Sequence, residues 1–89
     1  MTRDLNFLLN ESVLVGDLIM TINKNGKGIL TKSEPLNIFR DSSIGKENKA
    51  VAVNLIFQSS KKTLEDKDVN PVIDEIIRVI SKKYSAKLR

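Results

Sequence analysis

The sequence of 89 residues contains neither cysteine nor histidine. Without cysteine the chain can form no disulfide and no thiolate metal site, and without histidine it lacks the commonest general base and metal ligand. No apolar run approaches the roughly 20 residues that a membrane-spanning helix needs. These absences exclude thiol chemistry and histidine-based catalysis or metal binding, and they argue against a protein that spans a membrane.

What remains is the composition of an ordinary globular domain, with 40% hydrophobic and 29% charged residues. The length suffices for one modest core and therefore one domain. The net charge of +4 is mild but unevenly spread. Between positions 24 and 62 the chain carries eight Lys or Arg (24, 27, 32, 40, 46, 49, 61, 62) and three acids (34, 41, 47). This basic middle suits a polyanionic partner, and an ordinary solvated surface explains it equally well.

Hydrophobic periodicity predicts a strand, a helix and a second strand in the first half of the chain. Residues 4–10 place apolar side chains at every second position. Residues 15–22 place them on one face of a helix, and Asn25-Gly26 is typical of a helix end. Residues 29–40 form a second strand region. Pro35 predicts an edge strand or a bulge there, because proline donates no ladder hydrogen bond.

The second half contains a polar loop, a strand, a helix and a short final strand. The loop covers residues 41–48, and the alternating segment 49–59 is the clearest strand of the chain. A second helical stripe consists of Val69, Ile73, Ile76, Ile77 and Ile80. Proline is tolerated in the first helical turn and costly later, so Asn70-Pro71 predicts a late helix start near Asp68 or a slight kink. Residues 86–89 form the final strand.

The order βαββαβ predicts an α+β fold, a ferredoxin-like sandwich with two helices on one face of a four-stranded antiparallel sheet. Alternation then divides the strand residues between two faces. The face toward the helices contains Leu5, Phe7, Leu9, Ile38, Val51, Val53, Leu55 and Phe57. The open face contains Asn6, Leu8, Asn37, Phe39, Ala50, Ala52, Asn54 and Ile56. Functional residues are expected on the open face, because the fold does not require its side chains.

The open face has the residue types of a platform for an unpaired base. The ring of Phe39 can stack on a base, Ala50 and Ala52 let a base lie flat, and the amide of Asn37 can bond its edge. Three cations are candidates for phosphate contacts, namely Lys32, Arg40 and Lys49. An exposed phenylalanine on a sheet also suits packing against a neighbouring domain, so both interpretations stay open.

No residue pattern indicates catalysis in this chain. Gly26-Lys27-Gly28 lacks the spacing and the Ser or Thr of a phosphate-binding loop. Asp66 and Asp68 lie at the predicted start of the second helix, where carboxylates cap amides and complement the helix dipole. We therefore expect no catalytic residue and no metal ligand.

Five segments, taken in order, resemble one domain family. They are Arg3-Asp4-Leu5, then Leu36-Asn37-Ile38-Phe39-Arg40, then the stretch 49–57, then Thr63-Leu64-Glu65-Asp66-Lys67-Asp68-Val69, and finally Tyr84-Ser85-Ala86-Lys87-Leu88-Arg89. The corresponding family patterns are R-D-L, L-F-D-V-Y-R-G, K-S-L-A-F-x-L-x-F, T-L-T-D-E-E-V and F-G-A-E-L-R. The chain resembles the ferredoxin-fold anticodon-binding domain at the C-terminal end of the β subunit of bacterial-type phenylalanyl-tRNA synthetases.

This resemblance implies a tRNA-binding role. The chain, residues 1–89, would be an excised C-terminal domain of a β subunit that pairs with an α subunit in a cytoplasmic α2β2 ligase. The partner would be tRNA(Phe), with neither DNA nor a membrane involved. The parent would use ATP and Mg²⁺ on the α subunit, and this piece would hold no cofactor. By this resemblance, the residues that would contact the anticodon are Asn37, Phe39, Ala50 and Ala52.

The site departs from the family pattern at four positions. Asn37 replaces Asp, Phe39 replaces Tyr, Ala50 replaces Ser and Asp41 replaces Gly. These changes keep the stacking ring and remove polar contacts, so hydrogen-bond discrimination between bases should weaken. They also allow the alternative function of a structural domain whose open face docks on another part of a larger assembly and never meets RNA.

Overall fold

The computed structural model describes residues 1–88. Its strands are β1 (Thr2–Asn10), β2 (Leu30–Phe39), β3 (Asn48–Phe57) and β4 (Lys87–Leu88). Its helices are α1 (Val15–Lys24) and α2 (Asp66–Tyr84), and a 3-10 helix, η1 (Ser42–Ile44), lies in the predicted loop. The predicted order of elements is confirmed. Arg89, which the sequence assigned to the final strand, lies outside the described residues.

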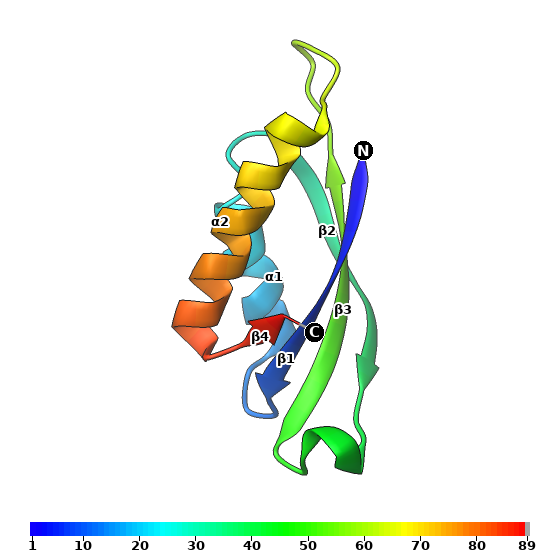
Figure 1. The fold of residues 1–89 in the computed structure, drawn as a ribbon, viewed down its shortest axis with the longest axis vertical. Coiled ribbons are helices and arrows are strands. Elements are labelled where there is room, and N and C mark those ends of the chain that lie inside the picture. Colours follow the sequence, from blue (N-terminus) through cyan, green and yellow to red (C-terminus); the bar gives the residue numbers. More distant parts are fainter. Residues whose placement is uncertain (89) are drawn as a thin grey trace.

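The four strands form one sheet in the order β2-β3-β1-β4, and every neighbouring pair is antiparallel. β3 lies between β1 and β2, which are joined through α1, so the unit is a split βαβ. Both helices lie on the same side of the sheet (Figure 1). The α+β ferredoxin-like sandwich is therefore confirmed, and within residues 1–88 no helix covers the opposite face.

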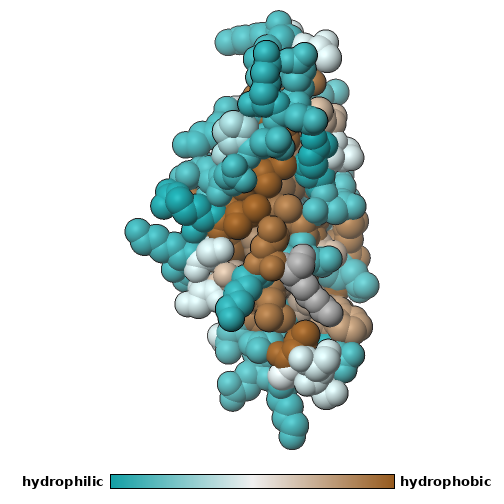
Figure 2. Space-filling model, in the orientation of Figure 1, coloured by the Kyte–Doolittle hydropathy of each residue, from teal (hydrophilic) through white to brown (hydrophobic). Residues whose placement is uncertain are grey.

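The core lies between the two helices and the covered face of the sheet. Its buried sheet residues are Phe7, Leu9, Val51, Val53, Leu55 and Phe57, and its buried helix residues include Leu18, Ile22, Val69, Ile73, Ile76 and Ile80. Figure 2 shows apolar side chains gathered in a stripe along the middle of this view and bordered by polar ones. The predicted face is confirmed for β1 and β3. Ile38 is 39% exposed instead, because it lies near the end of edge strand β2, where the helices do not cover it.

Helix α2 begins at Asp66, two residues before the predicted start near Asp68. The carboxylate of Asp68 accepts a hydrogen bond from the backbone N–H of Glu65 at 3.0 Å, which satisfies a donor at the start of the helix. Pro71 therefore stands inside the helix. The capping contact fixes the first turn ahead of the proline, and the alternative of a slight kink at Pro71 stays a prediction.

Strand β2 is an edge strand, and it also contains a bulge, as Pro35 predicted. Pro35 pairs with Val53 and Asn37 pairs with Ala52, so Leu36 is an extra residue in β2. The bulge changes which residues reach the open face. Before it, the even positions Lys32 and Glu34 share a face with residues 56 and 54, and after it the odd positions 37 and 39 share that face with residues 52 and 50.

Candidate functional site

Two cross-strand rows on the open face bring the predicted site residues together. In the first row, Ala52 of β3 pairs with Asn6 of β1 on one side and with Asn37 of β2 on the other. In the second row, Ala50 pairs with Leu8 and with Phe39. Directly paired residues in an antiparallel sheet share a face. The sheet register therefore gathers residues from three strands that are far apart in the sequence.

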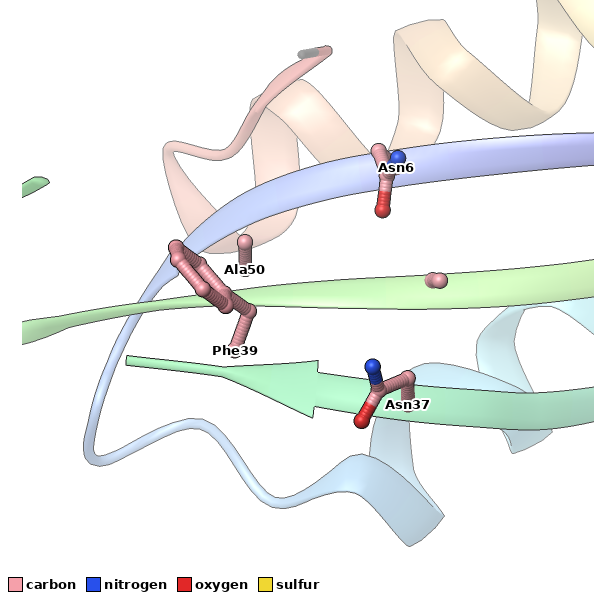
Figure 3. A pocket seen from close by; sticks show the side chains of 5 residues that line it. Asn6, Asn37, Phe39 and Ala50 are labelled. Atoms are coloured by element: carbon pink, nitrogen blue, oxygen red, sulfur yellow. The ribbon is translucent and has the colours of Figure 1, made fainter. Parts of the chain in front are cut away.

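The two rows form an open hollow of about 320 Å³. Its lining residues are Asn6, Asn37, Phe39, Ala50 and Ala52. Figure 3 shows Asn6 and Asn37 on the two strands that flank β3, with the ring of Phe39 standing beside Ala50. Phe39 is 44% exposed as a residue, whereas Ala50 is only 3% exposed between its larger neighbours. The hollow thus has a small apolar floor, one aromatic wall and two amides.

Asn6 is the lining residue that the predicted site omitted. The alternation of β1 placed it on the open face, but the sequence did not give the register that sets it opposite Ala52. None of the five lining side chains is ionisable. Amides both donate and accept hydrogen bonds, so the hollow suits a neutral planar ring whose edge carries donors and acceptors.

A third cross-strand row, Asp4, Asn54 and Glu34, borders the hollow on one side and is called the acidic row below. Asn54 pairs with Asp4 and with Glu34, and the amide nitrogen of Asn54 donates to the Asp4 carboxylate at 2.6 Å. Lys32 lies in the next row, opposite Ile56, and forms an ion pair with Glu34. The acidic row therefore separates Lys32 from the hollow.

Arg40 directly follows Phe39, the last residue of β2, and forms a two-pronged contact with Glu11. Its Nε donates to Glu11 Oε2 at 2.9 Å, and its Nη2 donates to Oε1 at 2.5 Å. These hydrogen bonds lower the pKa of the Glu11 carboxyl, and the carboxylate in turn raises the pKa of Arg40. Arg40 is thus the charged residue that follows Phe39 in the chain, and its guanidinium is held by a carboxylate of the turn after β1.

Lys49 lies on the other side of the sheet from the hollow. It precedes Ala50 in β3 and pairs with the buried Leu9, and only 5% of the residue is exposed. Its Nζ donates to the backbone carbonyl of Glu11 at 3.1 Å and lies 3.9 Å from the Glu11 carboxylate. The structure therefore brings Asn37, Phe39, Ala50 and Ala52 together. None of the three predicted phosphate contacts, Lys32, Arg40 and Lys49, lines the hollow, although Arg40 directly follows Phe39 in the chain.

Asp41, the residue that replaces a family glycine, is engaged in the turn after β2. One of its carboxylate oxygens accepts from the backbone N–H of Ser43 at 3.3 Å and from the hydroxyl of Ser42 at 3.2 Å. The side chain caps the short helix η1.

Residues 1–88 contain no group of three or more Asp, Glu, His or Cys side chains placed to hold a metal ion. Across residues 1–88, neither helix has the length and apolar character needed to cross a membrane.

Comparison with known proteins gives one consistent result. The three relatives described here are phenylalanine–tRNA ligase β subunits. That of Prochlorococcus marinus subsp. pastoris is 37% identical over 100% of this chain, that of Pseudoalteromonas translucida 33% over 98%, and that of Fusobacterium nucleatum subsp. nucleatum 31% over 98%. The chain spans 11% of the length of each of them. Residues 1–89 also match the family described as the ferredoxin-fold anticodon binding domain, and the chain belongs to this family.

Proposed function

We propose that this domain binds the anticodon loop of the phenylalanine tRNA on the open face of its sheet. The observation that carries the proposal is the hollow in which an exposed ring, two amides and two alanines meet. These are the features that single-stranded RNA sites combine, because bases stack on aromatic rings and are bonded at their edges. Family membership and the kind of protein found among the relatives agree with this function.

Each lining residue has a role in the proposal. One unpaired base stacks on the ring of Phe39, a contact that is typically worth about 1–3 kcal/mol. The base lies over Ala50 and Ala52, where a larger side chain would lift it off the sheet. Asn37 and Asn6 bond its edge from opposite sides. Because neither amide is charged, we expect moderate rather than strict discrimination between bases.

The anchor for the RNA backbone is Arg40 in this proposal. It follows Phe39 directly in the chain, its side chain is 56% exposed, and a guanidinium binds phosphate oxygens in pairs. Lys32 lies beyond the acidic row, and Lys49 is buried on the other face, so we assign neither of them a direct phosphate contact.

We infer that the domain acts within a cytoplasmic phenylalanine–tRNA ligase, as part of a β subunit that assembles with an α subunit into an α2β2 enzyme. Binding the anticodon loop would hold the tRNA so that its acceptor end reaches the catalytic centre on the α subunit, a use of binding energy for placement. ATP and Mg²⁺ would bind elsewhere in that enzyme. The lining residues of the hollow carry no carboxylate suited to Mg²⁺.

The test is the affinity of the 89-residue chain for a labelled phenylalanine-tRNA anticodon stem-loop. Phe39→Ala should weaken binding by roughly 5- to 150-fold, the loss of one stacked base. Phe39→Tyr keeps the ring and is the matched control, which should bind like the original chain. The proposal would be contradicted if the original chain, Phe39→Ala and Phe39→Tyr all bound this loop with equal affinity and bound a loop with unrelated bases equally well.

A domain whose open face docks on a protein partner is the second candidate, and the apolar side chains of that face favour it. Phe39 is 44% exposed there, and Leu8 and Ile56 share the face with it. A protein partner that covers them would bind with little dependence on salt, whereas RNA binding weakens steeply as salt increases.

A further inference from the structure

We propose that Glu11 is an internal competitor for the RNA backbone. In the free domain its carboxylate occupies the guanidinium of Arg40, and a phosphate of a bound RNA loop takes the place of that carboxylate. This inference rests on the proposed function, and it assigns a role to Glu11 and distinct roles to the two cations that contact it.

The first support is the geometry of the contact. Arg40 binds both carboxylate oxygens of Glu11 through Nε and Nη2, at 2.9 and 2.5 Å. A phosphodiester presents two oxygens to the same pair of donors, which is why arginine binds carboxylate and phosphate alike. Glu11 therefore holds Arg40, the residue that directly follows Phe39 in the chain, as a phosphate would.

The second support is that one carboxylate faces two cations. Lys49 is buried, its Nζ bonds the backbone carbonyl of Glu11, and it lies 3.9 Å from the Glu11 carboxylate. A buried ammonium is costly unless an opposite charge or a hydrogen-bonding group accompanies it. If Arg40 turns to a phosphate, Glu11 keeps Lys49 as its partner, so neither charge is left alone.

The third support is the difference in exposure between the two cations. The side chain of Arg40 is 56% exposed and that of Glu11 is 40% exposed, whereas the side chain of Lys49 is 6% exposed. Ion pairs between exposed side chains are weak because water competes for both partners. Arg40 is thus the movable cation and Lys49 the fixed one. The backbone N–H of Glu11 also donates to the Glu47 carbonyl at 2.6 Å, which anchors the acid to the segment before β3.

The experiment compares stem-loop binding at several salt concentrations for the original chain, Glu11→Gln, Arg40→Gln and the double variant. Glu11→Gln should tighten binding by roughly two- to five-fold, the scale of an exposed ion pair. Arg40→Gln should weaken binding and reduce the slope of log affinity against log salt by about 0.7, as expected for one lost phosphate contact. In the Arg40→Gln background, Glu11→Gln should have no further effect.

Glu75 and Arg78 supply the matched control. They form the same two-pronged pair on α2, with Nε and Nη2 of the arginine at 3.0 and 2.7 Å from the carboxylate oxygens. Glu75→Gln adds the same net charge as Glu11→Gln but lies on a helix, away from the hollow. Equal tightening by both variants would overturn the proposal, because a general charge effect would then explain it. The proposal would also be overturned if Glu11→Gln weakened stem-loop binding as much as Arg40→Gln does. Glu11 would then be a residue that positions Arg40 for the phosphate.

A second readout uses the original chain and does not depend on how the variants fold. The Nε–H resonance of Arg40 should shift when the stem-loop is added, while the Nε–H of Arg78 should not. An unmoved Arg40 resonance, in a titration that shifts Phe39 and Asn37, would overturn this inference and leave the proposed function standing. If the stem-loop affinity changes neither with Phe39→Ala nor with the loop sequence, the proposed function is overturned instead.

Discussion

Asn37 of β2 pairs with Ala52 of β3. In a β2 strand without a bulge, the residue before it, Leu36, would pair with Ala52 instead. The extra residue Leu36 produces this offset, and it puts Asn37 and Phe39, rather than Leu36 and Ile38, on the open face. The site therefore depends on a local irregularity of the edge strand. Pro35 favours that irregularity because it contributes no N–H to the ladder.

The floor of the hollow offers the first prediction. Ala52→Val adds two methyl groups beside Asn6 and Asn37, and valine is favoured in strands. We expect the fold to persist and stem-loop affinity to fall by roughly ten-fold or more, since the base can no longer lie flat on its stacking ring. Circular dichroism checks the fold and fluorescence anisotropy the affinity. Ile56→Val, on the same face beyond the acidic row, should leave binding unchanged, and a similar loss there would argue against the hollow as the site.

The buried ring of Phe7 offers the second prediction. It is fully buried in the core between β1 and the helices. Phe7→Ala should lower the free energy of unfolding by about 3–5 kcal/mol, because it removes apolar burial and leaves a cavity. Met20→Ala, at an exposed position on α1, should change it by less than about 0.5 kcal/mol. Urea unfolding measures both, and equal effects would contradict the core described here.

Two glycines make a matched pair for the third prediction. A Cβ on Gly26, just after α1, would lie 2.5 Å from the Cβ of Leu30, whereas a Cβ on Gly16 would meet nothing within 4 Å. Gly26→Ala should therefore destabilise the domain by about 1–3 kcal/mol, since the chain after α1 must shift. Gly16→Ala, inside α1, should stabilise it by about 0.5–1 kcal/mol. Thermal unfolding of the two variants should move in opposite directions, and a parallel change would be inconsistent with this packing.

The fourth prediction concerns pH. The Lys62 ammonium, and then the Glu65 backbone N–H, hold the pKa of Asp68 below its ordinary value. A carboxyl whose pKa is lower in the folded state stabilises the fold above its unfolded pKa, and this contribution is lost as pH falls through the folded pKa. The free energy of unfolding should thus decrease as pH drops below about 4.

Asp68→Asn separates this contribution from the other acids, since its amide cannot titrate. Urea unfolding from neutral to acidic pH should show a shallower decrease for this variant than for the original chain. Asp74→Asn, on the same helix, is the comparison variant. An identical pH dependence in Asp68→Asn and the original chain would rule out the predicted role of Asp68.

Much of the fold was predictable because short-range patterns determine it. The alternation of residues 49–57 specifies which side chains of β3 face the helices, and the structure agrees at Val51, Val53, Leu55 and Phe57. The start of α2 was predictable to within two residues, and the contact between Asp68 and the backbone N–H of Glu65 fixes it ahead of the proline.

The site was predictable in part, for a similar reason. Alternation and family resemblance gave Asn37, Phe39, Ala50 and Ala52, which the structure gathers at one hollow. Asn6 was missed because its place beside Ala52 depends on the register of β1 and β3. The surroundings of Lys49 and Arg40 were not predictable, since both meet Glu11, which lies 38 and 29 positions away in the sequence.

The central claim is that the hollow on the open face receives a base of the anticodon loop. The most direct measurement is the amide chemical-shift map of the ¹⁵N-labelled chain, titrated with the phenylalanine-tRNA anticodon stem-loop at low and moderate salt. If a base binds in the hollow, salt-sensitive shifts should be concentrated at Asn6, Asn37, Phe39, Ala50 and Ala52. Shifts scattered over the surface lysines and independent of loop sequence, or no shifts at all, would contradict this claim.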